Sequence, residues 1–500
     1  MLRIILIIAK NEKTKMFEIE LKFQIPEEKL DALIKAFQRK NDQTLHLQAK
    51  YYDTPSFILS EHSISLRQRL ENDHWVQTLK LPTEQKLKRA EFEQDLGTDE
   101  IELDLQNYLE NKAITKNIQS LLTQNKNLLE VQFQTDIERK LSNFKFQNSQ
   151  IEVSYDQGQI IAQHQTLALH ELEFELKQGT VQDLISFILP RVKRYGLWLD
   201  VRSKAQQGFQ LAQNIQHNPV QSQTALTLTS KDSPETALKK MFNNCLNHLL
   251  PNSTAIASGH FNSKHVHQAR VAIRRLRSAI KTFSGWSLHI DPTWQTQLIE
   301  LFRQLGSARD LDVIREELLP QLEAVGAPKF KLPESETTDT QKLTKLFRSF
   351  NFNYLVLSLI QFIEQDSNEK TKTSVHKLAL KKIGKLHHKI QLDAQNYLNL
   401  DIEARHKTRK NLKRLRYSLE FVSSLCDKKA VKKYLKSIKP AQESLGLYND
   451  FIVAEEILTK LVKTEPQVWF ALGWIAAEKQ RVLQQSQQDL LNFAQISTLQ

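Results

Sequence analysis

The sequence predicts two domains of different fold class, an α+β domain in the first half of the chain and an all-α domain in the second. Up to about residue 213, several segments alternate apolar and charged residues with a period of two, which is typical of β-strands. After Pro234 this alternation ends, and long amphipathic helical patterns replace it. A basic motif at 267–277 recurs at 406–416, which predicts a twofold internal repeat in the helical half. The length of 500 residues agrees with more than one domain, because a single hydrophobic core stops growing at about 250–300 residues.

The composition excludes several classes of protein. With 40% hydrophobic and 25% charged residues, the chain has the composition of a globular protein. Cys245 and Cys426 are the only cysteines, which excludes a disulfide framework and a cysteine-built zinc site and suits the reducing cytoplasm. No segment approaches the about 20 apolar residues of a membrane-spanning helix, so we expect no membrane partner. The apolar run near the start is short and lacks a cleavage site, so we expect residues 1–15 to be an extension without an export role.

The basic excess of the chain lies in its second half. Residues 1–230 contain 28 Lys and Arg against 30 Asp and Glu, whereas residues 231–500 contain 41 against 27. The formal net charge of +12 therefore belongs to the helical half, which favours a polyanionic partner there.

Periodicity and turn signals divide the chain into elements. We expect β-strands at 17–23, 63–72, 75–81, 89–96, 130–141 and 167–177. Helical patterns fit best at 27–40, 100–125 and 180–195. The polar, aperiodic stretch 214–234 predicts a linker between domains at 16–213 and 235–490. Within the second domain, we expect two repeat halves at about 235–327 and 341–490, on either side of a loop at 328–340.

Several of the expected strands carry charged residues of both signs on one face. Strand by strand, these same-face sets are Glu18, Glu20 and Lys22; Arg67 and Arg69; Arg89, Glu91 and Glu93; and Glu171, Glu173, Glu175 and Lys177. Like charges on neighbouring positions of one face repel each other, so the carboxylates need cations beside them. An antiparallel sheet with one solvated face explains the alternation, since such sheets are common. A sheet that closes around a polar lumen explains it too, and also accounts for matched sets on different strands.

A metal ion bound to a chain of phosphates would satisfy both signs of charge in such a lumen. Mg²⁺ and Mn²⁺ take hard oxygen ligands, often a few carboxylates together with phosphate oxygens. Arginine and lysine side chains bind the remaining phosphate oxygens. The chain has only 12 glycines and no Walker-type phosphate loop, so side chains must bind any phosphate.

The motifs of the first half resemble a known family. The stretch "EIELK" (18–22) resembles the amino-terminal E-x-E-x-K signature of CYTH domains, which belong to the triphosphate tunnel metalloenzyme superfamily. The supporting motifs follow in the family's order: "YYDTP" (51–55), "LRQR" (66–69), "TLK" (78–80), "RAEFE" (89–93), "DIER" (136–139), "YDQGQI" (155–160), "ELEFELK" (171–177) and "RSKAQQGF" (202–209). The resemblance covers residues 16–213 and implies a closed, eight-stranded antiparallel tunnel that hydrolyses triphosphates with Mg²⁺ or Mn²⁺.

The resemblance also implies roles for individual residues. The implied metal ligands are Glu18, Glu20, Glu171, Glu173 and Glu175. The implied triphosphate-binding residues are Lys22, Arg67, Arg69, Lys80, Arg89, Arg139 and Lys204. The candidate catalytic residues are Glu18, Glu20, Lys22, Lys80 and Glu173. We expect Glu91 and Glu93 in the lumen, and Lys177 to neutralise its glutamate neighbours.

The two basic motifs of the second half repeat with a nearly constant offset. "HQARVAIRRLR" (267–277) aligns with "HKTRKNLKRLR" (406–416) at an offset of 139, and "LGSARD" (305–310) aligns with "LGLYND" (445–450) at an offset of 140. On helices, each copy places a histidine and three cations in one stripe: His267, Arg270, Arg274 and Arg277, and His406, Arg409, Lys413 and Arg416. A single charged stripe is usually a solvated face, but a solvated face does not need the same cation spacing twice.

These blocks resemble the CHAD domain, an all-helical module with a twofold internal repeat. The resemblance covers about 235–490 and implies that the two basic stripes bind inorganic polyphosphate. We expect Asp310 and Asp450, each after a Leu-Gly turn, to brace the arginines rather than to contact the ligand. Arg309 aligns with Asn449, so the two copies differ at that position.

The order CYTH then CHAD resembles bacterial inorganic triphosphatases. The expected function is hydrolysis of inorganic tripolyphosphate to pyrophosphate and phosphate, with polyphosphate bound in the basic helical domain. Thiamine triphosphate or a nucleoside triphosphate as substrate, and cyclisation of ATP as in class IV adenylate cyclases, remain alternatives within the same fold. A polyphosphate-binding protein with an inert tunnel is an alternative of another class. The basic stripes contain no aromatic residues for base stacking, which argues against nucleic acid as the partner.

Overall fold

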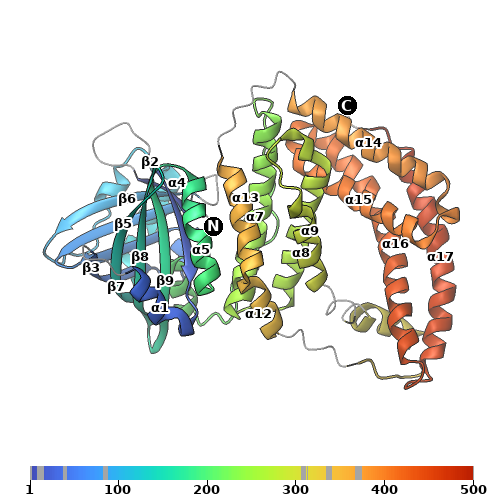
Figure 1. The fold of residues 1–500 in the computed structure, drawn as a ribbon, viewed down its shortest axis with the longest axis horizontal. Coiled ribbons are helices and arrows are strands. Elements are labelled where there is room, and N and C mark those ends of the chain that lie inside the picture. The colour runs from blue at the N-terminus through green and yellow to red at the C-terminus, as the bar shows by residue number, and fades with distance from the viewer. Residues whose placement is uncertain are drawn as a thin grey trace. The chain divides into compact units, whose positions relative to one another are not determined.

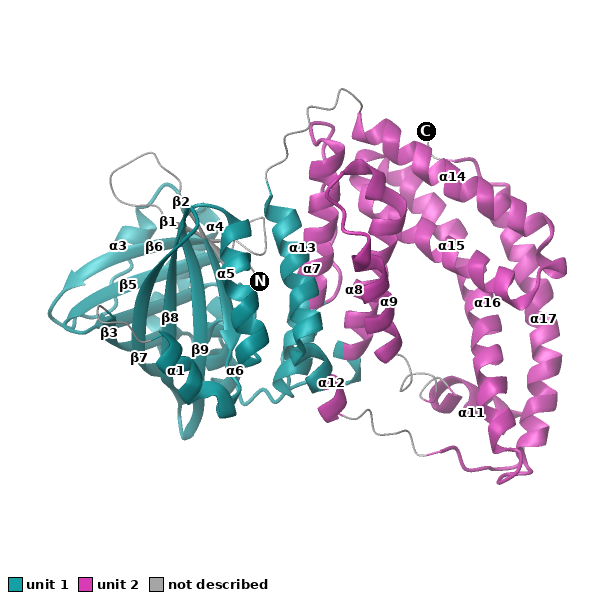
Figure 2. Ribbon diagram, viewed as in Figure 1, with its two compact units in different colours: residues 1–221, 250–265, 344–365 teal, residues 222–249, 266–343, 366–500 magenta. Residues whose placement is uncertain are grey.

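Strands fill the first half of the chain and helices the second (Figure 1). The computed structural model describes residues 3–7, 16–37, 42–82, 88–305, 311, 314–333, 340–365 and 374–498. Two compact units form, one of residues 1–221, 250–265 and 344–365, the other of residues 222–249, 266–343 and 366–500 (Figure 2). The segments 250–265 and 344–365 therefore lie apart in sequence from the strands with which they cluster.

One closed sheet forms the centre of the first unit. Its strands are β1 Arg3–Ile7, β2 Met16–Gln24, β3 Gln43–Asp53, β4 Ser65–Glu71, β5 His74–Pro82, β6 Lys88–Gly97, β7 Glu130–Phe146, β8 Ser149–Ala162, β9 Gln165–Gln178 and β10 Trp198–Leu199. They lie in the order β1-β6-β5-β4-β3-β7-β8-β9-β2-β10, and β1 also pairs with β2, which closes the sheet into a tunnel. All described pairs are antiparallel except β1 with β6, which are parallel. The α+β class and the closed antiparallel tunnel are as the sequence predicts.

The structure adds strands to those that periodicity predicts. The six expected strands correspond to β2, β4, β5, β6, β7 and β9, whereas β3 and β8 complete the eight of the family. The segment Arg3–Ile7 lies in the expected amino-terminal extension and forms a ninth strand, β1, between β2 and β6. Five consecutive residues rich in branched apolar side chains favour such an inserted strand.

Helices cover two parts of the outer surface of the sheet. The helices of this half are η1 Glu27–Lys29, α1 Leu30–Phe37, α2 Ile58–Glu61, α3 Gln106–Leu109, α4 Lys116–Asn125, η2 Lys126–Leu128, α5 Val181–Tyr195 and α6 Lys204–Ala212. Helix α5 packs on β9 and β8, where the ring of Phe187 contacts the rings of Phe174 and Phe144. On β4, β5 and β6 an apolar cluster joins Leu66, Leu79 and Phe92 to Tyr108 of α3 and Leu122 of α4. The outward apolar residues are therefore buried, which leaves the charged residues to face the lumen.

Helix α6 and aromatic side chains fill part of the lumen. The ring of Phe133 stacks on Tyr51, with centroids 4.4 Å apart, and meets the ring of Phe209 of α6 edge-on at 5.0 Å. These residues belong to one apolar cluster with Leu47, Ala49, Ile137 and Ala205. Because Gly208 of α6 leaves no space for a Cβ beside Phe133, its lack of a side chain permits this close approach.

The second half of the chain is helical. Its helices are α7 Pro234–Ser258, α8 Ser263–Phe283, η3 Ser284–Trp286, α9 Thr293–Gln304, η4 Ile314–Leu318, α11 Leu319–Ala324, α12 Thr340–Arg348, α13 Phe350–Glu364, α14 Val375–Gln395, η5 Tyr397–Asn399, α15 Ile402–Val422, η6 Ser423–Leu425, α16 Lys428–Leu461 and α17 Val468–Ala494. The repeated basic motifs occupy α8 and α15, which have the same length of 21 residues. Among the helices described, none alone has the length and apolar composition to cross a membrane, although α12 and α13 together, with a 45° bend, meet that test.

The expected turn at Leu445 and Gly446 is wrong. Both residues lie inside α16, which runs without a break from Lys428 to Leu461 and also contains Pro440. A single glycine inside a helix costs only about 1 kcal/mol relative to alanine, so tertiary packing overrides it. The aligned turn at 305–310 falls mostly outside the described residues, as do Arg309 and Asp310.

Candidate active site

The lumen faces of β2, β9 and β8 form a ladder of side chains. Because side chains in a strand alternate with a period of two, each same-face residue meets its partners on the neighbouring strands. The cross-strand rows are Glu20–Glu175–Glu152, Lys22–Glu173–Ser154 and Gln24–Glu171–Asp156. The first row contains three carboxylates, and the ammonium of Lys177 lies 2.7 Å from Glu175 and 3.3 Å from Glu152. The first row thus has the most carboxylates of the three, and Lys177 partly neutralises it.

A cavity of about 200 Å³ lies in the lumen. Its charged lining comes from eight elements and comprises Glu20, Arg67, Arg69, Lys80, Glu91, Glu93, Arg139, Asp156, Glu173, Glu175 and Lys204. Its apolar lining includes Leu47, Ala49, Tyr51 and Ile137, which belong to the cluster around α6. The cavity is therefore lined by charged side chains and, beside α6, by apolar ones.

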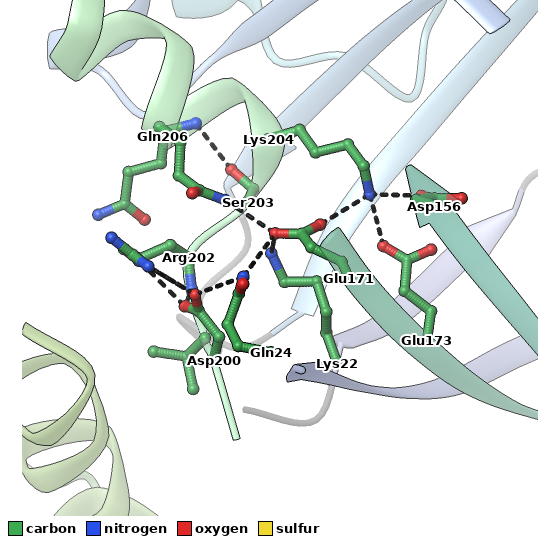
Figure 3. A network of polar contacts seen from close by, with 12 residues as sticks. Lys22, Gln24, Asp156, Glu171, Glu173, Asp200, Arg202, Ser203, Lys204 and Gln206 are labelled. Atoms are coloured by element: carbon green, nitrogen blue, oxygen red, sulfur yellow. Dashed lines mark hydrogen bonds and ion pairs between the residues drawn. The ribbon is translucent and has the colours of Figure 1, made fainter. Parts of the chain in front are cut away.

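Lys204 at the start of α6 joins three lumen carboxylates (Figure 3). Its Nζ lies 2.8 Å from Asp156, 2.9 Å from Glu171 and 2.8 Å from Glu173. Burial alone would lower the pKa of this ammonium, but the three carboxylates outweigh burial and raise it well above its usual value. Ser203 caps α6 by accepting a hydrogen bond from the backbone N–H of Gln206, which fixes the first turn that carries Lys204.

Arg139 of β7 holds two of the same carboxylates. Its guanidinium donates to Asp156 at 2.6 and 2.7 Å and to Glu173 at 2.6 Å. Burial would raise the pKa of Glu173, but Lys204 and Arg139 hold it well below its usual value. Burial likewise acts against Arg139, yet Asp156 and Glu173 raise the pKa of the guanidinium. All these groups therefore remain charged at neutral pH, and the carboxylates are poor proton acceptors in this state.

The opposite wall of the cavity carries the other cations. Lys80 of β5 lies 2.7 Å from Glu91 of β6, and Arg67 of β4 lies 3.8 Å from the same carboxylate. Burial opposes the charge of Arg67, but Tyr51 and Glu91 raise its pKa. Burial and then the neighbouring Arg67 lower the pKa of Arg69, while Glu71 acts in the opposite direction. Two adjacent guanidiniums that face a cavity form a site for an anion.

The oxygen donors of the ladder fit a hard divalent metal ion. Mg²⁺ is usually bound through one or two carboxylates together with substrate phosphates, rather than by a cage made only of protein groups. Among the residues that the structure describes, no group of three or more acidic, histidine or cysteine side chains could hold a metal ion by itself. The carboxylate-rich row of Glu20, Glu175 and Glu152 supplies the right ligand type for an ion that shares its coordination with phosphate.

Most of the predicted tunnel residues meet in this cavity or beside it. Lys22 and Glu171 lie next to the cavity as a buried ion pair of 2.6 Å, rather than in its lining. The side chains of Glu18 and Arg89 lie outside the described part. In the backbone register, Ile5 of β1 lies opposite Glu18 of β2 on one side and Arg89 of β6 on the other. Lys177 pairs with Glu175 and Glu152, as expected for a neutralising residue.

Sequence reasoning missed four acidic and basic residues of this network. Asp156 and Glu152 share the lumen face of β8, and the alternation in "IEVSYDQG" (151–158) would have found them. Asp200 and Arg202, 2.7 Å apart, lie just before α6. They carry no periodic signal, since the segment between β10 and α6 has no regular structure.

The helical unit has a cavity of about 220 Å³ between its two basic helices. Arg274, Arg277 and Lys281 line it from α8, and Arg409, Lys410, Lys413 and Arg414 line it from α15, together with His406. Both copies of the repeated motif therefore face one cavity. Lys281, Lys410 and Arg414 were not predicted, although Lys281 continues the stripe of α8 four residues after Arg277.

The cations of this cavity lower one another's pKa values. Burial, followed by Arg409 and Arg274, lowers the pKa of Lys413 to about 7. Burial also lowers the pKa of Lys410 and of Lys281, and nearby arginines add to the shift. Asp450 lies 3.8 Å from Arg409, in the bracing position predicted for it. An anion in this cavity would relieve the repulsion among the cations.

Three predicted residues of the helical unit lie away from the cavity lining. His267 is not among the residues that line the cavity. Arg270 donates to the carbonyl oxygen of Leu305, and its guanidinium lies 4.7 Å from the ring centroid of Phe302. Arg416 is paired with Glu420 at 2.8 Å. These contacts hold the side chains on the helix surface beside the cavity.

The two units correspond to two known protein families. Residues 16–188 match the family model of the CYTH domain, and residues 240–459 match that of the CHAD domain. The chain therefore carries a CYTH domain followed by a CHAD domain.

The chain is also similar to individual proteins and solved structures. The chain is 31% identical over 208 residues to a protein of Haemophilus influenzae named inorganic triphosphatase, a match that covers 40% of this chain and 56% of that protein. The chain thus spans about half the length of that relative. Among solved structures, the CHAD domain of Ricinus communis covers 56% of this chain and 98% of its own length, with a TM-score of 0.45 and 26% identity. A proposed adenylyl cyclase from Hippeastrum, described as having a dominant triphosphatase activity, covers 39% of this chain and 95% of its own, with a TM-score of 0.23 and 16% identity.

Proposed function

We propose that the tunnel hydrolyses inorganic triphosphate to pyrophosphate and phosphate with a bound Mg²⁺ or Mn²⁺ ion, and that the basic helical cavity binds inorganic polyphosphate. The observation that carries the first part is the convergence of lumen carboxylates, arginines and lysines around one cavity of about 200 Å³. The Haemophilus relative, named inorganic triphosphatase, supports the same substrate. Two free cysteines, one of them buried, support a cytoplasmic location.

The cations of the cavity would bind and neutralise the phosphates. Lys80, Arg67 and Arg69 lie on one wall, and Arg139 and Lys204 lie on the other. Positioning and charge stabilisation supply most of the catalysis in phosphoryl transfer. Water attacks the terminal phosphorus, the bond to the bridging oxygen breaks, and pyrophosphate leaves with its new charge held by these side chains. The proton that the water loses passes to solvent, since the carboxylates held by Lys204 and Arg139 are poor proton acceptors.

The carboxylates would hold the metal ion beside the phosphates. Glu20 and Glu175 line the cavity in the carboxylate-rich row, and we assign Glu18, Glu171 and Glu173 to the same ligand set or its support. When bound, the ion supplies charge neutralisation and polarises phosphate oxygens. The residues Lys22, Lys80 and Glu173 complete the proposed catalytic group with Glu18 and Glu20.

Phosphate release from tripolyphosphate, ATP and thiamine triphosphate, each with Mg²⁺ or Mn²⁺, tests the tunnel assignment. We expect tripolyphosphate to give the highest kcat/KM. The substitution Glu20→Gln should lower turnover at least about 100-fold, as loss of a group that acts in the transition state does. The control is Glu138→Gln, on the outer face of β7, whose side chain is 52% exposed.

The same panel distinguishes the alternatives. Preference for ATP with formation of cyclic AMP would indicate an adenylate cyclase, and preference for thiamine triphosphate would indicate a different substrate. Absence of phosphate release from all three, with polyphosphate binding intact, would indicate a binding protein without catalysis.

The proposal for the helical cavity rests on its uncompensated charge. Seven lysine and arginine side chains line it, and the carboxylate nearest to them in the described contacts is Asp450. We propose that Arg274, Arg277, His406, Arg409 and Lys413 contact the ligand, with His267, Arg270 and Arg416 at the margin. Titration with long-chain polyphosphate should show at least a tenfold loss of affinity in the double variant that combines Arg274→Ala and Arg409→Ala. The control Lys439→Ala, on the exposed face of α16, should bind polyphosphate as the wild-type protein does.

A further inference from the structure

Two segments of the helical half of the sequence belong to the unit of the tunnel. Residues 250–265 and 344–365 cluster with the strands (Figure 2), although both lie within the range 240–459 that matches the CHAD domain. The second of these segments contains α13, which packs on α5 and on β10. The tunnel is therefore supported by residues that its own family model does not include.

Asn353 of α13 makes the most specific of these contacts. Its side chain is buried, with 1% exposed. Its Oδ1 accepts a hydrogen bond of 2.8 Å from the backbone N–H of Leu199. Its amide nitrogen donates to the carbonyl oxygen of Ser349 at 2.9 Å, so both ends of the side chain are held. A buried backbone N–H must be paired, and here a side chain distant in sequence supplies the partner.

The segment that Asn353 holds runs from β10 to α6. Trp198 and Leu199 pair with Gln24 and Phe23 of β2, and the N–H of Asp200 donates to the carbonyl oxygen of Lys22 at 3.0 Å. On the other side, the N–H of Val201 donates to Oγ1 of Thr254 at 3.4 Å. The guanidinium of Arg348 lies 5.2 Å from the ring centroid of Trp198. The segment is thus fixed between β2 and residues from the two helical segments.

A chain of polar contacts continues from this segment into the lumen (Figure 3). Asp200 accepts hydrogen bonds from Arg202 at 2.7 Å and from the side-chain amide of Gln24 at 3.0 Å. The same amide of Gln24 lies 3.1 Å from Glu171. Glu171 then contacts Lys204, which is the first residue of α6 and directly follows the held segment.

We propose that Asn353 is a positioning residue for the tunnel. By holding the N–H of Leu199, it fixes residues 198–203, and with them the ammonium of Lys204 among the lumen carboxylates. The inference rests on the proposed function, in which Lys204 binds phosphate. The new element is that Asn353, a residue from the helical half of the sequence, sets the position from which Lys204 contacts phosphate.

Full-length Asn353→Leu tests this role, because leucine has a similar size and no acceptor. We expect KM for tripolyphosphate to rise about tenfold with a smaller change in kcat, as loss of one charge-assisted hydrogen bond to phosphate would cause. Asn353→Asp keeps the acceptor for the N–H of Leu199 but loses the donor to the carbonyl oxygen of Ser349, so we expect it to restore only part of the affinity. The matched control is Asn125→Leu, since Asn125 is also a buried helical asparagine of this unit but bonds only to the carbonyl oxygen of Leu121 in the described contacts.

A second measurement does not depend on activity. Acetic anhydride should modify Lys204 slowly in the wild-type protein, because its ammonium is buried among carboxylates. Peptide mass spectrometry should show modification of Lys204 several-fold faster in Asn353→Leu and unchanged in Asn125→Leu. Unchanged KM and unchanged labelling in Asn353→Leu, or equal changes in the control, would overturn the inference. If the wild-type protein releases no phosphate from any triphosphate, the proposed function fails, and the labelling of Lys204 alone decides the role of Asn353.

Discussion

The ammonium nitrogen of Lys22 lies 2.6 Å from Oε1 of Glu171, although 149 residues separate the two in sequence. Both side chains are buried, and the same carboxylate also accepts from Gln207 at 2.9 Å. A buried charge without a partner costs several kcal/mol, so the ammonium of Lys22 depends on Glu171, whereas Glu171 also has Lys204 at 2.9 Å. Strands β2 and β9 are therefore held together by this ion pair as well as by backbone hydrogen bonds.

Removal of the guanidinium of Arg139 should destabilise the tunnel. Arg139→Met leaves Asp156 and Glu173 with Lys204 as their remaining cation, and we expect the free energy of unfolding to fall by about 3 kcal/mol at pH 7. Arg139 and Lys204 hold the pKa of both carboxylates below the unfolded value, so their stabilisation is present above about pH 4 and is lost as the pH falls further. The deficit of the variant should therefore shrink below about pH 4. Urea unfolding at several pH values measures the free energy of unfolding of the variant and of the wild-type protein. As a control, Arg303→Met breaks an exposed ion pair with Glu300 and should lower the free energy of unfolding by less than about 1 kcal/mol.

Chelation of divalent metal should stop turnover and leave the fold intact. Lys22, Lys204 and Arg139 already neutralise the buried carboxylates, so the closed sheet does not need an ion for its stability. We expect EDTA to reduce phosphate release to the background and to change the midpoint of thermal unfolding by less than about 2 °C. Loss of secondary structure in EDTA would contradict this prediction. Addition of excess Mg²⁺ should restore turnover.

Two glycine-to-alanine substitutions should have opposite effects on stability. In Gly208→Ala the new Cβ would meet the ring of Phe133 at 2.1 Å, so α6 or the ring must move. Such overpacking costs about 1–3 kcal/mol, and we also expect lower activity because α6 carries Lys204. Gly384 lies inside α14, and a Cβ added there would meet no other group within 4 Å, so Gly384→Ala should stabilise the protein by up to about 1 kcal/mol. Denaturant unfolding measures the free energy of unfolding of both variants, and kinetic assays measure their kcat. Changes of the same sign in the two free energies of unfolding would contradict the prediction.

Polyphosphate binding in the helical cavity should weaken as the pH rises through neutrality. The pKa of Lys413 is lowered to about 7 by burial and by Arg409 and Arg274, while Asp450 acts in the opposite direction. Lys413 is therefore charged below about pH 7 and loses its charge above it, so we expect several-fold tighter binding at pH 6 than at pH 8. Calorimetric titration at constant ionic strength measures the effect. Lys413→Met should bind with the weaker affinity at both pH values, and an unchanged pH dependence in this variant would assign the effect to another group.

The alternation of charge along the strands determined which residues share one face of a strand. Glu20 and Lys22, and Glu173 and Glu175, point the same way because the side-chain period of a strand is two, whatever the rest of the fold does. The repeated spacing of cations on α8 and α15 likewise predicted two equivalent basic helices. These features are local, so the sequence alone was sufficient to find them.

The partner of each lumen residue was decided only by the tertiary structure. The register between strands distant in sequence brings Lys22 to Glu171 and places Glu20 opposite Glu175 and Glu175 opposite Glu152. Packing also keeps α16 helical at Gly446 and places Asn353 beside the N–H of Leu199. No local pattern encodes such contacts, because their free energy comes from residues that meet only when the whole sheet has closed.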